Sequence, residues 1–301
     1  MRSVEQLGRV GVVGASGGFR GASIVGFLEG LTERGAVIEY AYGVSVSALV
    51  LAGFAEAHSP EKYPRALSRI IQRFREVEER GSEEVFNFNP LNLAGHLLGD
   101  SLMGNSSLYE LLFGLDIESC LNSPMRFDFG VQSEQKGENI IFSNRSSIFE
   151  LNSELFRRAV VASASLTPFF APVEIGGDSC TDGISISLDG ATKHCDTVFV
   201  LFPYPRKHQM DNDVFPPWFR HFVINYEIQI RKTDARILEC ALSHAQIRGH
   251  PKIYRVFADD SPLSLGTLSF KKKSRNYEGD LTVARLGAKS LIERKLRSIL
   301  R

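Results

Sequence analysis

A serine between an apolar run and a stretch of small apolar residues constrains the fold of this chain more than any other feature. Residues 36–42 are mostly apolar, as in a buried strand, and residues 47–55 are small, apolar and numerous enough for a buried helix. Between them stands Gly43-Val44-Ser45-Val46-Ser47. A strand, a tight turn and a helix in this order predict a nucleophile elbow, which exposes Ser45 at the carboxyl end of a sheet. The first N–H groups of such a helix face any oxyanion that develops there.

Ser47 departs from the usual elbow pattern, G-x-S-x-G, because a serine takes the place of the last glycine. A side chain at this position can clash with the neighbouring strand, so we expect a somewhat widened elbow. The pattern by itself also fits a glycine-rich turn without a catalytic role. Both interpretations stay open until other features are considered.

Segments typical of strands and of helices alternate along the chain. Further strands are predicted at residues 9–13, 126–131, 139–143, 198–202 and 253–257. Those at 126–131 and 139–143 are predicted to pair as a hairpin. Asn152 and Asp234 are predicted to be the N-caps of two helices. This alternation predicts an α/β fold of three layers, in which helices cover both faces of a mostly parallel central sheet. No repeat or clear linker interrupts the pattern, so residues 1–301 are expected to form a single domain.

Composition excludes several classes of function. The chain has 35 Lys plus Arg and 35 Asp plus Glu residues, and this balance leaves no net field to attract nucleic acid. Four widely spaced cysteines without a C-x-x-C pair argue against a disulfide framework or a zinc site and favour a reducing compartment. No apolar run reaches the ~20 residues of a transmembrane helix, and the amino terminus lacks the pattern of a signal peptide. We therefore expect a cytoplasmic protein.

A glycine-rich loop, residues 14–21, follows the first predicted strand and precedes a helix. Consecutive glycines let backbone N–H groups point into one concavity, because no Cβ obstructs the approach of a ligand. Such a concavity suits either a phosphate or the oxyanion of an acyl transfer. The spacing of Gly14, Gly17 and Gly18 matches neither a Walker A loop nor the dinucleotide-binding pattern G-x-G-x-x-G. The oxyanion interpretation is therefore preferred.

A third segment, residues 162–173, is rich in small residues and proline and leads to Asp182-Gly183-Ile184. An Asp before a Gly is common in turns. Together with the loop and the elbow, however, this segment makes the chain resemble the patatin-like phospholipases. These enzymes carry a G-G-x-R-G loop, a G-x-S-x-G elbow and a small-residue segment that ends in D-G-[GA], in the same order. Residues 108–112 and 277–296 also look like later parts of the family, so the resemblance spans nearly the whole chain.

The resemblance implies catalysis by a Ser–Asp dyad, with Ser45 as the nucleophile and Asp182 as the general base. Because an ordinary carboxylate with a pKa of ~3.9 is a poor base for a hydroxyl, burial would have to raise the pKa of Asp182. The backbone N–H groups of Gly17, Gly18 and Val46 would form the oxyanion hole. The residues that would support the loops are Arg20, Gly21, Gly43 and Gly183. The implied substrate is a lipid ester, cleaved as by a phospholipase A or a lysophospholipase through an acyl-Ser45 intermediate, without a metal or organic cofactor.

Two alternatives to a working dyad remain. His194 follows Asp182 in the chain, as in the Ser–Asp–His order of α/β-hydrolases, so it is the rival base. If Ser47 distorts the elbow, the chain would instead be a lipid-binding or regulatory protein with impaired catalysis. Ile184 replaces the small residue expected after Asp182-Gly183, which would change the shape of the pocket and leave the carboxylate in place.

Contact with a membrane surface rests on three segments. Residues 214–222 combine the only tryptophan with three phenylalanines and two basic residues, which fits an interfacial anchor and also an aromatic helix start packed on the core. The basic run at 271–275 fits anionic headgroups and also a solvated loop. The apolar residues 85–113 fit a lid or a wall for an acyl chain and also ordinary packing. The expected partners are thus a lipid substrate and a membrane surface to which the protein binds peripherally. The oligomeric state stays unknown.

Overall fold

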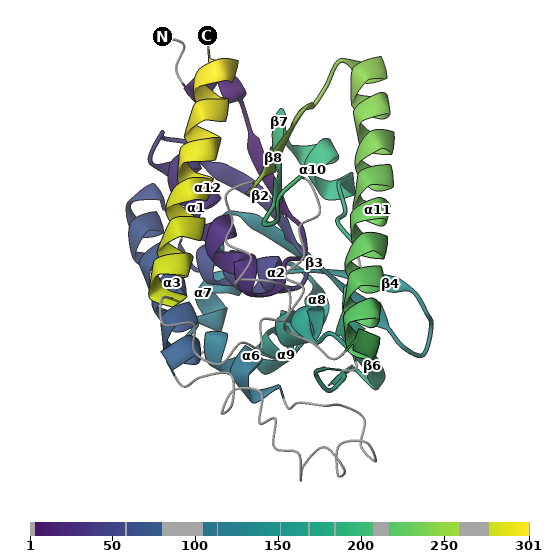
Figure 1. The fold of residues 1–301 in the computed structure, drawn as a ribbon. Coiled ribbons are helices and arrows are strands. Elements are labelled where there is room, and N and C mark those ends of the chain that lie inside the picture. The colour runs from purple at the N-terminus through teal and green to yellow at the C-terminus, as the bar shows by residue number, and fades with distance from the viewer. Residues whose placement is uncertain are drawn as a thin grey trace.

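The apolar runs of the sequence form one mostly parallel sheet in the computed structural model of this chain (Figure 1). The structure describes residues 4–57, 59–79, 105–112, 114–150, 152–167, 169–183, 185–206, 217–258 and 277–300. Within these ranges the sheet has eight strands in the order β5-β6-β3-β2-β1-β7-β8, with β4 paired to β3 off this path. The strands are β1 (Val10–Gly14), β2 (Ile38–Gly43), β3 (Arg126–Ser133), β4 (Asn139–Ser143), β5 (Val173–Ile175), β6 (Asp178–Asp182), β7 (Thr197–Phe202) and β8 (Lys252–Phe257).

Strands β3, β2, β1, β7 and β8 run parallel to one another. On the other side of β3, β4 and β6 each pair antiparallel with β3, and β5 pairs antiparallel with β6. Parallel strands with helices on both faces are buried throughout, and every residue of β1 and β7 is buried. This burial explains why the runs at 9–13 and 198–202 are recognisable from apolar residues alone. The predicted hairpin is confirmed, because β3 and β4 pair antiparallel with Asp128 opposite Ser143.

Helices cover both faces of the sheet and give the three layers that the sequence predicts (Figure 1). The larger core involves α1 (Gly21–Thr32), α2 (Val46–Ala55), α3 (Tyr63–Glu79), α6 (Ser106–Leu111), α7 (Ile117–Leu121), α8 (Ser147–Glu150), α9 (Ser153–Ala164) and α12 (Tyr277–Ile299). The smaller core lies between the sheet and α10 (Asp189–His194) and α11 (Pro217–Arg248). Short 3-10 turns occur at Val4–Leu7, Gly18–Arg20 and Pro60–Lys62. The predicted α/β fold is confirmed.

The last described helix, α12, packs lengthwise on α1, and the two helices run in the same direction (Figure 1). Gly26 of α1 lies against the backbone of Arg285, and Arg34, just after α1, pairs with Glu293 at 3.7 Å. Because the partner numbers rise together along both helices, α12 ends beside the end of α1. The chain passes from there into β2, so the end of α12 lies toward the amino ends of the parallel strands.

The two predicted helix caps have different outcomes. Asn152 is the N-cap of α9 as predicted, and its side chain accepts a hydrogen bond from a backbone N–H three residues later at 3.3 Å. The cap at Asp234 is wrong, because α11 begins at Pro217 and runs through this position. Asp234 is buried instead, and its carboxyl group accepts hydrogen bonds from the N–H of Ile186 at 2.9 Å and the hydroxyl of Tyr204 at 3.4 Å. It therefore ties α11 to the loop that follows β6.

Several expectations concern residues or side chains outside the described part of the chain. They are the lid or acyl-chain wall within 85–104, the aromatic and basic side chains of 214–222, the basic run at 271–275, and Ile184. The remainder of the apolar stretch, residues 105–112, is described and carries α6. Among the described residues, none of the helices is both long and apolar enough to cross a membrane.

Candidate active site

The predicted strand–turn–helix lies where β2 ends at Gly43 and α2 begins at Val46. Ser45 has φ 58° and ψ −135°, and of the described residues other than glycine it alone has a positive φ. Such a backbone costs ~1–3 kcal/mol and persists only where the surroundings hold it in place. Gly43 allows the sharp turn, because a Cβ there would lie 2.7 Å from the backbone nitrogen of Ala48.

Ser45 and Asp182 meet at the carboxyl ends of the parallel strands. Oγ of Ser45 donates a hydrogen bond to Oδ2 of Asp182 at 2.8 Å, and both side chains are buried. Asp182 is the last residue of β6, and its N–H donates to the carbonyl of Ser165 at 3.0 Å. Burial raises the pKa of Asp182 well above its ordinary value, while the hydrogen bond from Ser45 acts in the opposite direction. A carboxylate with a raised proton affinity can accept the proton of a hydroxyl that attacks a carbonyl carbon.

The glycine-rich loop between β1 and α1 lies beside the elbow. Ser16 and Gly18 line one cavity with Ser45 and with Val46, the first residue of α2. Gly18 has φ 53°, a conformation that favours glycine. The remaining predicted residues pack around this site: Gly17 against Pro203, Gly21 against Phe74 and Val46, Gly183 against Gly130, and Arg20 within the interior. The loop and the elbow thus face one space beside the Ser45 hydroxyl.

Ser47, the departure from the usual elbow, fits against β1 without a clash. Its hydroxyl donates a hydrogen bond to the carbonyl of Ala15 at 2.5 Å, and its side chain is fully buried. The facing residue on β1 is Gly14, where a Cβ would lie only 2.7 Å from the Cβ of Ser47. The elbow lacks its last glycine, and Gly14 on the neighbouring strand leaves the space that the Ser47 side chain occupies. Gly14 was visible in the sequence, but its position opposite Ser47 depends on the pairing of β1 with β2.

The rival base, His194, does not lie beside this pair. His194 is exposed at the end of α10, where Nε2 lies 3.4 Å from Nη1 of Arg126 and the ring packs beside Tyr40. Asp182 uses Oδ2 for Ser45, and its Oδ1 has no hydrogen-bond partner in the described part of the chain. The Ser–Asp–His order is therefore not assembled as a triad. No three His, Cys, Asp or Glu side chains among the described residues form a group that could hold a metal ion.

A cavity opens at Ser45 and has one polar end. Ser45 and Asp182 lie at that end, and the remaining walls are mainly apolar. The apolar lining consists of Val46, Leu49, Phe74, Leu108, Leu111, Ala164, Leu166 and Phe170. Apolar walls with a few polar groups are typical of sites for small organic molecules. Leu108 and Leu111 belong to α6, so part of the apolar stretch expected to contact an acyl chain does reach the site.

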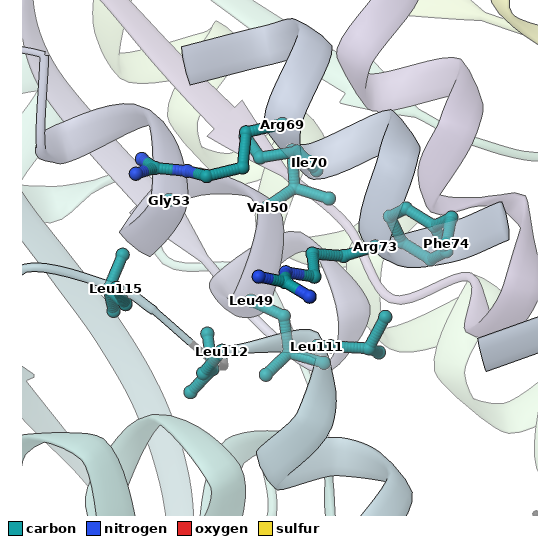
Figure 2. A pocket seen from close by; sticks show the side chains of 10 residues that line it. All are labelled: Leu49, Val50, Gly53, Arg69, Ile70, Arg73, Phe74, Leu111, Leu112 and Leu115. Carbon is teal, nitrogen blue, oxygen red and sulfur yellow. The ribbon is translucent and has the colours of Figure 1, made fainter. Parts of the chain in front are cut away.

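Figure 2 shows the residues that line a second cavity, which shares three lining residues with the first. Leu49, Phe74 and Leu111 line both cavities, and the second continues between α2, α3 and the residues after α6. Figure 2 shows that Arg69 and Arg73 are its charged lining residues. Arg69 pairs with Glu56 and Arg73 with Glu76, so each guanidinium already has a carboxylate beside it. An apolar surface thus extends beyond the space next to Ser45.

Comparisons with known proteins agree with this fold. The family model described as patatin-like phospholipase matches residues 12–188. No curated protein sequence matches the chain. Among solved structures, human GIVD cytosolic phospholipase A2 has a TM-score of 0.52 at 13% identity, with 98% of this chain and 60% of that chain covered. VipD from Legionella pneumophila has a TM-score of 0.49 at 13% identity, with 96% of this chain and 67% of that chain covered. This chain thus spans about three fifths of the human protein's structure, and the likeness to it extends to the fold.

Proposed function

The chain belongs to the patatin-like phospholipase family, and we propose that it is a serine lipid acyl hydrolase with Ser45 as nucleophile and Asp182 as general base. The observation that carries this proposal is the 2.8 Å hydrogen bond from Ser45 Oγ to Asp182 Oδ2 at the polar end of an apolar cavity. The pair is the arrangement that nucleophilic catalysis requires, a hydroxyl bonded to a group able to take its proton.

The proposed reaction has two acyl-transfer steps. In the first, Ser45 Oγ attacks the ester carbonyl carbon as its proton passes to Asp182. The ester C–O bond then breaks, and the departing alcohol takes the proton from Asp182 while the acyl group stays on Ser45. In the second step water attacks the acyl-Ser45 carbonyl, and Asp182 accepts its proton and returns one to Ser45 as the fatty acid leaves.

The oxyanion of each tetrahedral intermediate needs donors beside Ser45. We assign this role to the backbone N–H groups of Gly18 and Val46, because both residues line the cavity. Val46 is the first residue of α2, where a helix has no internal partner for its N–H. Loss of one such donor typically costs about 3 kcal/mol of transition-state stabilisation. Gly17, expected as a third donor, packs against Pro203 beside them.

The proposed substrate is a phospholipid or lysophospholipid with an acyl chain held by the apolar walls of the cavity. Leu49, Phe74 and Leu111 would contact this chain, and burial of their surface from water favours binding. Because such substrates lie in membranes, the protein would act at a membrane surface, with residues 214–222 as the candidate contact. Residues 1–301 would work as one domain, since β7 lies between β1 and β8 and α12 packs on α1.

An alkyl fluorophosphonate probe, which reacts with activated serines, tests the nucleophile. Wild type should be labelled, and Ser45→Ala should not, while its circular dichroism stays that of wild type. Asp182→Asn should keep the fold and lose about 10²–10⁴-fold in fatty-acid release from mixed vesicles of diacyl and monoacyl phosphatidylcholine. Absence of labelling in folded wild type would reject the proposal and leave the lipid-binding alternative. Near-normal turnover by Asp182→Asn would reject the base.

Membrane contact has its own test. Wild type should co-sediment with phosphatidylcholine vesicles more strongly than Trp218→Ala does, because tryptophan favours the interface. Equal co-sedimentation would argue against residues 214–222 as the contact.

A further inference from the structure

Ser163 lies behind the elbow and bonds to the backbone of Ser45. Its Oγ accepts a hydrogen bond from the N–H of Ser45 at 3.2 Å and donates one to the carbonyl of Gly130 at 2.6 Å. The side chain is fully buried in the last two turns of α9. Because the hydroxyl proton goes to Gly130, a lone pair of Oγ is left to face the N–H of Ser45. This chain of two bonds joins the elbow to β3.

The N–H of Ser45 needs such a partner. A buried backbone N–H without one costs ~1–3 kcal/mol, and the positive φ of Ser45 adds strain of its own. A change in φ at Ser45 rotates this N–H and also moves Cβ and Oγ. The bond to Ser163 therefore opposes the backbone rotation that would carry Oγ away from Asp182.

The same end of α9 also holds Asp182. The carbonyl of Ser165 accepts the N–H of Asp182 at 3.0 Å, two residues after Ser163 in the chain. One short segment thus binds the backbone of both members of the dyad. β3 supports the arrangement, because Gly130 accepts from Ser163 and the next residue, Val131, pairs with Asp182 across the sheet.

We infer that Ser163 is a positioning residue, which holds the Ser45 backbone so that Oγ keeps its hydrogen bond to Asp182. The expected effect on catalysis rests on the proposed function, whereas the contact between Ser163 and the Ser45 N–H rests on the geometry alone. Ser163 is not among the lining residues of the cavity at Ser45, so its effect would act through Ser45. A displacement of a reacting group by about 1 Å can cost about 10²-fold in rate.

The side chain of Ser165 offers a matched control two residues away, because Ser165→Ala keeps the backbone carbonyl that accepts the Asp182 N–H. This side chain is fully buried as well, but its Oγ donates to the carbonyl of Val161 within the same helix at 2.9 Å. Ser163→Ala and Ser165→Ala each remove one buried hydroxyl, but Ser163→Ala removes two hydrogen bonds and Ser165→Ala one, so Ser163→Ala should destabilise the protein more in urea unfolding. Only the first change removes the partner of the Ser45 N–H.

Fluorophosphonate labelling rates and ester kinetics separate the two roles. Ser163→Ala should lower the labelling rate and kcat about 10–100-fold with KM little changed, and Ser165→Ala should stay within about twofold of wild type. If Ser163→Ala does not fold, Ser163→Cys retains a weaker acceptor at nearly the same size and should give a smaller loss. Equal rates for the folded Ser163 variant and Ser165→Ala would overturn the positioning role.

Hydrogen exchange at the Ser45 N–H gives a readout that does not need activity. This amide should exchange faster in the Ser163 variant and remain protected in Ser165→Ala. If wild type fails to label while this exchange pattern is seen, the proposed function fails and the contact stands. If wild type labels and exchange at Ser45 is the same in both variants, the inference about Ser163 fails and the proposed function stands.

Discussion

Replacing Ser47 by glycine restores the usual elbow pattern, yet it should destabilise the protein and leave its reactivity unchanged. The Ser47 hydroxyl donates to the carbonyl of Ala15 in the buried interior, and losing such a bond costs about 1 kcal/mol. A glycine in place of serine in the first turn of α2 adds up to about 0.5 kcal/mol. The free energy of unfolding should therefore fall by about 1–2 kcal/mol.

The facing residue turns this change into a double-mutant cycle. Gly14→Ala in wild type would place a Cβ 2.7 Å from Cβ and 2.9 Å from Oγ of Ser47, and such overpacking costs about 1–3 kcal/mol. With glycine at position 47 both of these contacts disappear. The nearest remaining side-chain atom is Cδ1 of Leu51 at 3.6 Å, an ordinary contact. The double variant should thus be more stable than the two single changes predict by about 1–3 kcal/mol.

Urea unfolding of the four proteins, followed by circular dichroism, measures the cycle. Fluorophosphonate labelling of the same proteins measures reactivity, which Ser47→Gly should change less than about twofold because Ser47 bonds to Ala15 and not to the dyad. Additive free energies within about 0.5 kcal/mol would refute the pairing of Ser47 with Gly14. A large gain in labelling by Ser47→Gly would refute the conclusion that this serine is accommodated.

Three further predictions concern pH and the cavity. Because burial raises the pKa of Asp182, kcat/KM should rise with pH along a limb whose midpoint lies well above the ordinary value of 3.8, and a midpoint near 3.8 would contradict the role as base. Burial also raises the pKa of Asp234 from 3.8 to about 7, so the folded protein keeps the proton of Asp234 to a higher pH than the unfolded chain does. The free energy of unfolding should therefore fall by up to about 4 kcal/mol as the pH rises from 3.8 to about 7. Urea unfolding across this range should show a smaller fall for Asp234→Asn, and an equal fall would refute the assignment. Leu111→Trp should lower kcat/KM for long-chain nitrophenyl esters more than for short-chain ones, and an equal loss at every length would argue against an acyl chain at this wall.

Local patterns were enough to predict the elements around Ser45, but they did not predict β6, the strand that ends at Asp182. The strand before Ser45 and the helix after it are mainly apolar, and the structure buries both apart from Glu39. Asp182 could be named only with the help of the family pattern, because an Asp before a Gly has many ordinary uses in turns. That pattern says nothing about the 2.8 Å distance between the two side chains, which depends on the packing of β6 beside β3.

The remaining errors and omissions come from contacts between distant segments. Asp234 looked like a helix cap because acidic residues accept N–H bonds there, but the N–H that it accepts belongs to Ile186, 48 residues away. Ser163 lay within a run of small residues, and nothing in that run distinguishes it from Ser165. Only the position of α9 behind the elbow does so.

The parallel packing of α12 on α1 also decides where other proteins can be attached. The end of α12 lies toward the amino ends of the parallel strands, and Leu7, near the first described residue, accepts a hydrogen bond from Thr197 at the start of β7. The Ser45 cavity opens at the carboxyl ends of the same strands. A fused domain, an affinity tag or a solid support joined at either described end would therefore occupy the side of the sheet away from the cavity, and lipid would keep its access to Ser45.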